Sequence, residues 1–139
     1  MYHTNICSLK ANFDNLEILL YDIGFDPDII TLSEIWHSES KKHLFISPVL
    51  ENYFPLQTET GTTAKSGVGI YVKSNLDLIS RPDLNFKYYK KDSEEFEGLW
   101  LEIPKTNSPN IAKGVIYRHP SQDIIKFDKS LDSTLKILY

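Results

Sequence analysis

The chain has 139 residues, of which 41% are hydrophobic and 24% charged, and this composition is typical of one globular domain or of part of a larger one. Its 12% aromatic content argues against disorder, and no apolar run approaches the roughly 20 residues that a membrane span needs. The formal net charge of −4 disfavours a protein that binds nucleic acid by charge alone, but it leaves open an enzyme that recruits a divalent cation to meet phosphate.

The beginning of the chain predicts a strand, a helix and a second strand. Residues 2–7 are typical of a short strand, Ser8 can cap the helix that follows, and Gly24 can end it. An apolar, β-branched run over 28–33 follows Pro27 and predicts a strand buried on both faces. Five apolar residues recur between the strands at helical spacing and predict a buried stripe: Phe13, Leu16, Leu19, Leu20 and Ile23. The two strands should therefore be parallel, with a right-handed crossover.

Two polar side chains stand at the carboxyl ends of these strands. Asn5 lies towards the end of the first strand and Glu34 directly follows the second. Open α/β sheets place ligands at this edge, and the ends of neighbouring strands lie about 4.8 Å apart. We therefore expect Asn5 and Glu34 to face one crevice, although a solvated glutamate at a strand end is the alternative.

The middle of the chain predicts two further strands, at 53–58 and 67–72, joined by a loop over 58–66. The two glycines of the second of these strands lack the lysine and helix of a phosphate loop, so close sheet packing explains them better. Residues 37–49 are polar and can hold a short helix, and the lysines within them form either a small basic patch or a solvated face.

The last third predicts a hairpin and a helix. Residues 81–94 are interpreted as an exposed connection, and strands over 96–103 and 110–117 should pair antiparallel. Ser121 is the predicted cap of a final helix, with Asp123 in its first turn. The predicted buried stripe of this helix comprises Ile124, Phe127, Leu131, Leu135 and Leu138. The chain stops at its last residue directly after the helix, which we interpret as the end of an incomplete domain.

Four segments in this order resemble the endonuclease/exonuclease/phosphatase superfamily, and more closely the apurinic-type endonuclease domain of non-LTR retrotransposons, the LINE and jockey-like elements. The segments are 3–9, 28–36, 66–72 and 115–120, supported by 96–100 and Phe127. The resemblance covers essentially all of 1–139, but only the first part of the family domain. It implies an α+β fold, in which this chain is a partial two-layer β-sandwich with flanking helices that begins with a β-α-β unit.

The resemblance also implies a site and a reaction, the metal-dependent hydrolysis of a phosphodiester. Glu34 matches the family's metal-binding glutamate, and Asn5 the asparagine beside it in the metal and phosphate site. Tyr117 matches the tyrosine that contacts the scissile phosphate, and Arg118 belongs to the Tyr-Arg-x-Pro signature of the retrotransposon branch and is a candidate substrate-binding residue. The implied cofactor is Mg²⁺ or Mn²⁺, which prefers oxygen ligands and can manage with one carboxylate.

Two departures from the family pattern bear on activity. Position 35 is isoleucine where the family usually has threonine, so a polar group next to the metal ligand is lost. The later Gly-Asp-Phe-Asn and Ser-Asp-His motifs, which supply the water-positioning groups and the histidine base, do not occur in this sequence. We therefore expect no appreciable nuclease activity from this chain alone.

The leading hypothesis is thus the N-terminal portion of a retrotransposon endonuclease domain, and the alternative is a non-catalytic remnant or interaction module. The implied partners are DNA and a reverse transcriptase encoded downstream, with no membrane. The single cysteine, Cys7, favours an intracellular location, nuclear in an active element, although no localisation signal is seen. We further expect Cys7, Trp36 and Trp100 to be buried, and the isolated chain to be marginally stable because the sheet face formed by 68–72 and 99–103 would be partly uncovered.

Overall fold

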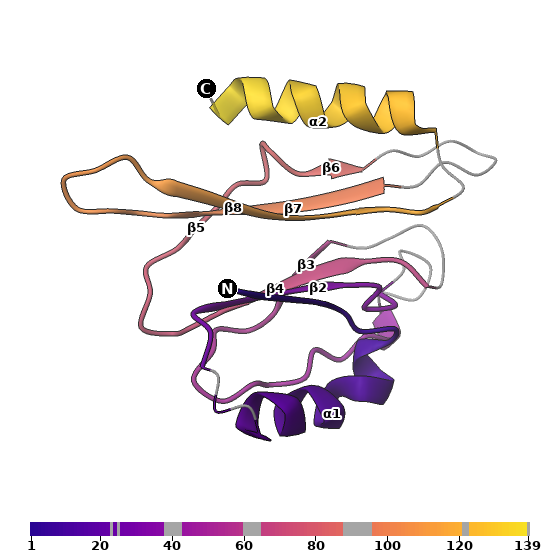
Figure 1. Ribbon diagram of the computed structural model, residues 1–139, viewed down its shortest axis with the longest axis vertical. Coiled ribbons are helices and arrows are strands. Elements are labelled where there is room, and N and C mark those ends of the chain that lie inside the picture. The colour runs from indigo at the N-terminus through magenta and orange to yellow at the C-terminus, as the bar shows by residue number, and fades with distance from the viewer. Residues whose placement is uncertain are drawn as a thin grey trace.

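The computed structural model arranges the chain in four layers: a helix, two facing β-sheets and a second helix (Figure 1). Helix α1 (Leu9–Asp22) covers the outer face of the first sheet, and helix α2 (Ile124–Leu138) lies over the outer face of the second. The α+β class predicted from the sequence is confirmed. The structure describes residues 1–22, 24, 26–37, 43–59, 65–87, 96–120 and 123–138.

The first sheet has the strand order β1-β2-β4-β3, in which β1 is Tyr2–Asn5, β2 is Ile29–Ser33, β3 is Gln57–Glu59 and β4 is Val68–Val72. Strands β1 and β2 are parallel, as predicted, and their last residues, Asn5 and Ser33, stand opposite each other. All five residues of β2 are buried, as its continuous apolar run predicted. Strand β3 is shorter than the predicted 53–58, of which Tyr53 forms only an isolated bridge to Lys73.

The second sheet is built on the long hairpin of β7 (Phe96–Ile103) and β8 (Ile111–Arg118), which pair antiparallel as predicted. Two very short strands that the sequence did not reveal, β5 (Ile79–Ser80) and β6 (Phe86–Lys87), pair with the other edge of β7.

The gap between β5 and β6 is closed by local hydrogen bonds. The N–H of Arg81 donates to the carbonyl of Trp100 over 3.2 Å, and the N–H of Trp100 donates to Oδ1 of Asn85 over 2.8 Å. Leu84, between them, is buried. The interpretation of 81–94 as an exposed connection is therefore wrong for the buried Leu84 and for the strand at 86–87, but holds for the exposed Pro82 and Asp83. Residues 88–95 lie outside the described part.

The two sheets pack face to face through a continuous apolar cluster. Its members come from both sheets: Ile29, Val68, Ile70, Val72, Leu99, Leu101, Ile103 and Val115. A second cluster lies between the first sheet and α1 and includes Leu9, Leu16, Leu32 and Tyr71. The expectation that residues of 68–72 and 99–103 would be partly uncovered is therefore wrong, because the short strands and the hairpin already supply a second sheet to cover them.

The helices begin at side-chain caps. Ser8 Oγ accepts the N–H of Ala11 over 3.4 Å, as predicted, whereas Asp123 Oδ1 accepts the N–H of Ile125 over 2.9 Å and is itself the cap of α2. The predicted cap Ser121 lies outside the described residues.

Both predicted helical stripes are only partly buried. In α1, Leu16 is buried but Leu19 is 39% exposed, and Ile23 is not described. In α2, Ile124 and Leu135 are exposed, and the buried residue is Thr134. Helix α2 contacts the second sheet through the edge-to-face pair of Phe127 and Phe96.

The two tryptophans differ. Trp100 is 8% exposed and its ring lies over Gly114, where an added Cβ would come within 2.6 Å of the ring, so the prediction of a core position is confirmed. Trp36 is 41% exposed, and the same prediction is wrong for it. Within 37–49, residues 38–42, which include both lysines, lie outside the described residues, and the described remainder shows a 3-10 turn at 43–44 and no α-helix. Among the described residues, no helix is long and apolar enough to cross a membrane.

Candidate functional site

The candidate site is built on two turns that run side by side beyond the carboxyl ends of β1 and β2. The N–H of Ile6 donates to the carbonyl of Ser33 over 3.0 Å, and the N–H of Ser8 donates to the carbonyl of Glu34 over 2.9 Å. Ile35, the next residue, donates its N–H to the carbonyl of Gly67 over 3.1 Å. The backbone of Glu34 is therefore held between α1 and the start of β4.

Both turns use backbone conformations that side chains rarely adopt. Cys7, Ser8, Glu34 and Trp36 have φ angles of 46°, 87°, 53° and 60°. Such conformations cost on the order of 1–3 kcal/mol each, and they persist where the surrounding structure imposes them. The side chains of these residues are consequently presented in fixed directions at one place on the surface.

The structure brings three of the predicted site residues together. The hydroxyl of Tyr117, near the end of β8, donates to Oε1 of Glu34 over 2.8 Å, although the two residues are 83 positions apart in the sequence. Asn5 Oδ1 accepts the N–H of Cys7 over 3.2 Å, and Cys7 Sγ lies 3.3 Å from this oxygen and 3.5 Å from Glu34 Oε2. The carboxylate, the amide oxygen and the hydroxyl therefore face one another at the edge of both sheets.

The surroundings of Glu34 favour its ionised form. Burial alone would raise the pKa of Glu34, but hydrogen bonds from Asn5, Tyr117 and Cys7, together with the positive charge of His119, hold that pKa below its ordinary value. Burial and the neighbouring Glu34 carboxylate raise the pKa of Tyr117, so its hydroxyl stays protonated and remains a donor. The site thus holds a carboxylate anion beside a permanent hydrogen-bond donor.

Cys7 is a member of this site that sequence reasoning missed. The prediction that Cys7 is buried is wrong, because the thiol is exposed beside Glu34. Desolvation by nearby atoms, the hydrogen bond to Glu34 and the charge of that carboxylate raise the pKa of Cys7. The thiol therefore stays neutral and acts as a weak donor to the two oxygens.

A buried carboxylate supports the site from behind. Glu97 is 2% exposed, and its Oε2 accepts the N–H of Gly67 over 3.2 Å between the two sheets. It stands directly opposite Tyr117 in the β7–β8 register. The burial of Glu97 could have been predicted from the sequence, because side chains alternate along a strand and Glu97 is an even number of residues from the inward-facing Leu99 and Leu101.

Arg118 is not brought to Glu34 with the others. It is the residue after Tyr117 in β8, so strand alternation directs it to the opposite face of the sheet. Its Nη1 donates to the carbonyls of His119 and Pro120, over 3.3 and 3.5 Å. The predicted substrate contact of Arg118 stays a prediction.

The donor set suits a hard divalent cation that keeps most of its water. Glu34 and Asn5 offer a carboxylate and an amide oxygen within reach of the same thiol, and such a cation can be held by one or two carboxylates plus waters. Among the described residues there is no group of three His, Cys, Asp or Glu side chains that could hold a metal ion. Glu34 and Asn5 could hold such a cation through their oxygens, whereas the described residues do not form a closed site of three such side chains.

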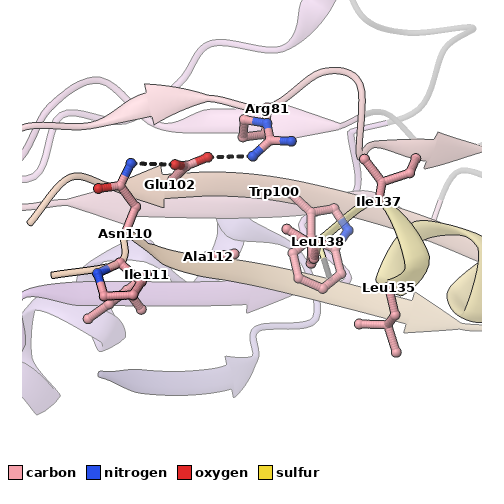
Figure 2. A pocket seen from close by; sticks show the side chains of 10 residues that line it. Arg81, Trp100, Glu102, Asn110, Ile111, Ala112, Leu135, Ile137 and Leu138 are labelled. Carbon is pink, nitrogen blue, oxygen red and sulfur yellow. Dashed lines mark hydrogen bonds and ion pairs between the residues drawn. The ribbon is translucent and has the colours of Figure 1, made fainter.

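A cavity of about 720 Å³ lies elsewhere, between the end of α2 and the outer face of β7–β8 (Figure 2). Glu102 bridges Arg81 and Asn110 at one end of it, and Trp100, Leu135 and neighbouring apolar side chains line the other. This cavity is at the start of β8, whereas Tyr117 is near its end. It is therefore separate from the candidate site.

No family model and no curated protein matches this sequence. The functional assignment therefore depends on the geometry of Glu34, Tyr117 and Asn5, and on the chemistry that these groups can perform.

The hydrogen bond from Tyr117 predicts a measurable effect on Glu34. In Tyr117→Phe we expect the pKa of Glu34 to rise, because one of the groups that stabilise the carboxylate is removed. The pKa of Glu34 is lower in the folded than in the unfolded state, so its ionised form stabilises the fold at any pH above the unfolded-state pKa. This contribution to stability is lost as the pH falls through the folded-state pKa. The variant should therefore lose less stability on acidification than the unmodified chain.

Carboxyl-carbon NMR titration of Glu34 in both proteins measures the shift. Tyr53→Phe is the matched control, since the Tyr53 hydroxyl donates to the carbonyl of Pro27 and not to Glu34. A Glu34 pKa that is unchanged or lower in Tyr117→Phe contradicts the prediction.

Proposed function

We propose that this chain carries the metal- and phosphate-binding part of a DNA endonuclease domain of the non-LTR retrotransposon type. The observation that supports the proposal most is the convergence of the Glu34 carboxylate and the Tyr117 hydroxyl, with Asn5 beside them, from distant parts of the sequence. The two facing sheets with outer helices agree with an endonuclease/exonuclease/phosphatase-like sandwich. That residues 1–139 form the N-terminal portion of such a domain stays a prediction.

Each residue has a role that its chemistry supports. Glu34, and through its amide oxygen Asn5, would hold Mg²⁺ or Mn²⁺, which when bound neutralises charge developing on phosphate oxygens. Tyr117 is protonated and can donate a hydrogen bond to a phosphate oxygen, which is the kind of fixed donor that stabilises a transition state. DNA is the partner, and a reverse transcriptase encoded downstream is the second partner in a complete element.

The same residues also limit the reaction. The motifs that would bring a histidine base and water-positioning groups are not in this sequence. The described residues offer one acidic side chain at the site and no three-member metal cluster, and this observation favours the second candidate, a non-catalytic remnant of the same domain. The two candidates differ in whether Glu34 still binds a cation.

Cation binding tests the proposal. We expect Mn²⁺, followed by electron paramagnetic resonance, to bind this chain weakly at one site, and we expect Glu34→Gln to reduce that binding at least about tenfold because the anionic ligand is removed. Glu17→Gln, on the exposed face of α1, is the matched control and should bind as the unmodified chain does. Equal binding by all three proteins supports the remnant and contradicts the proposed site.

A plasmid-nicking assay with Mg²⁺ or Mn²⁺ tests the expected lack of activity in parallel. The chain alone should leave supercoiled DNA intact, because no residue in it takes the place of the missing base. Clear nicking that disappears in Glu34→Ala contradicts this expectation while supporting the metal site.

A further inference from the structure

An aromatic groove of about 570 Å³ lies beside the candidate site. It runs between the first turns of α1 and the segments 35–36 and 44–48. Seven of its lining side chains are apolar or aromatic: Phe13, Ile35, Trp36, Leu44, Phe45, Ile46 and Pro48. Trp36 follows Glu34 by two residues in the same turn, so the groove begins next to the backbone that carries the carboxylate.

Trp36 is displayed on this surface instead of being packed. Its side chain is 41% exposed, and its φ of 60° is unusual for a bulky residue. The ammonium of Lys65 lies 5.9 Å from the centre of the ring, within the range of a cation–π interaction. The fold therefore leaves this aromatic ring partly exposed to solvent, with a cation over it.

A nucleobase matches this arrangement better than other flat ligands. Bases stack on exposed aromatic rings whatever their identity, and each such contact contributes between about 5-fold and 150-fold in affinity. Lys65 over the ring and Lys10 along the groove are suited to the neighbouring phosphates, with Asp14 the acidic group in the lining. Since the net charge of the chain is −4, long-range attraction cannot supply the affinity, and stacking has to.

We propose that this groove binds an unstacked base of a single-stranded nucleic acid, stacked on Trp36 next to Lys65. The inference rests on the proposed function, because it places the phosphate beside that base within reach of Glu34 and so defines the substrate as a locally unpaired strand. A fully paired duplex keeps its bases stacked on each other and cannot present one to Trp36.

Tryptophan fluorescence tests the proposal directly. A single-stranded thymidine octanucleotide, added to the full chain in the presence of a metal chelator, should quench the emission of Trp36 and leave that of the buried Trp100. Anisotropy of the labelled oligonucleotide should show affinity about 10-fold to 100-fold weaker in Trp36→Ala, and close to the original in Trp36→Phe, which keeps a stacking face. Lys65→Gln should bind several-fold more weakly.

Tyr21→Ala is the matched control, since Tyr21 is an exposed aromatic residue on α1 that does not line the groove. Unchanged affinity in Trp36→Ala, equal binding of a fully paired duplex, or quenching by an apolar helical peptide but not by the oligonucleotide each overturns the proposal. Glu34→Gln separates the two hypotheses: retained quenching with lost Mn²⁺ binding supports the groove and the metal site independently. Lost quenching in chains that still bind Mn²⁺ overturns only the groove.

Discussion

Leu101→Ala should lower the free energy of unfolding by about 2–5 kcal/mol, the range for deleting most of a fully buried leucine side chain. Leu101 is 1% exposed and lies in the cluster between the two sheets. Its loss leaves a cavity that the flanking strands cannot fill without moving closer together and disturbing the rest of their packing. Urea denaturation followed by circular dichroism measures the change.

The control is Ile79→Ala in β5, one position away in the register, where the side chain is 46% exposed. We expect it to cost about 1 kcal/mol or less, because most of its surface is already in water. Similar losses for both variants would mean that the sheets are loosely packed, as the sequence had led us to expect, and would restore the prediction of a marginal chain. A single sharp transition for the unmodified protein with a large Leu101→Ala effect supports the closed sandwich.

Gly67→Ala should destabilise the protein by about 2–5 kcal/mol and also weaken cation binding. Gly67 has a φ of 99°, outside the range that L-residues adopt readily, and a Cβ there would come within 2.8 Å of the His37 carbonyl oxygen and 3.1 Å of Ile35 Cγ1. The carbonyl of Gly67 accepts the N–H of Ile35, so relief of the clash would move the turn that carries Glu34.

Gly24→Ala is the matched control for backbone strain. Its φ is 56°, and nothing lies within 4 Å of the added Cβ, so we expect a cost of roughly 1–2 kcal/mol and unchanged Mn²⁺ binding. Thermal melts of both variants measure the cost of backbone strain, and Mn²⁺ titration measures whether the turn that carries Glu34 has moved. If Gly67→Ala behaves like Gly24→Ala in both measurements, the backbone of Gly67 does not position the site.

The features that could be predicted from the sequence depend on patterns that one segment displays by itself. The apolar run of β2 indicated a strand buried on both faces, and its position before Glu34 located the carboxylate at a sheet edge. The turn-rich residues between β7 and β8 indicated a hairpin. These patterns are reliable because periodicity and turn-forming residues are properties of a single segment and do not depend on its partners.

The features that were missed depend on pairing between segments. Strands β5 and β6 have two residues each, too few for any periodicity, and they exist because β7 offers an edge to them. The exposure of Trp36 follows from the left-handed backbone of its turn, which no residue type in the sequence announces. The burial of Glu97 depends on the first sheet closing over it, with the Gly67 N–H as its partner.

The hydrogen bond between Tyr117 and Glu34 crosses from one sheet to the other, since Glu34 follows β2 and Tyr117 belongs to β8. The hydrogen bond of the site therefore forms only when the two sheets are correctly aligned with each other. A slide of one residue along a strand, about 3.3 Å, would take the two oxygens beyond hydrogen-bonding distance while leaving each sheet intact. A folding intermediate in which both sheets have formed but have not yet packed in the correct alignment would contain every residue of the site. It would lack the hydrogen bond between Tyr117 and Glu34.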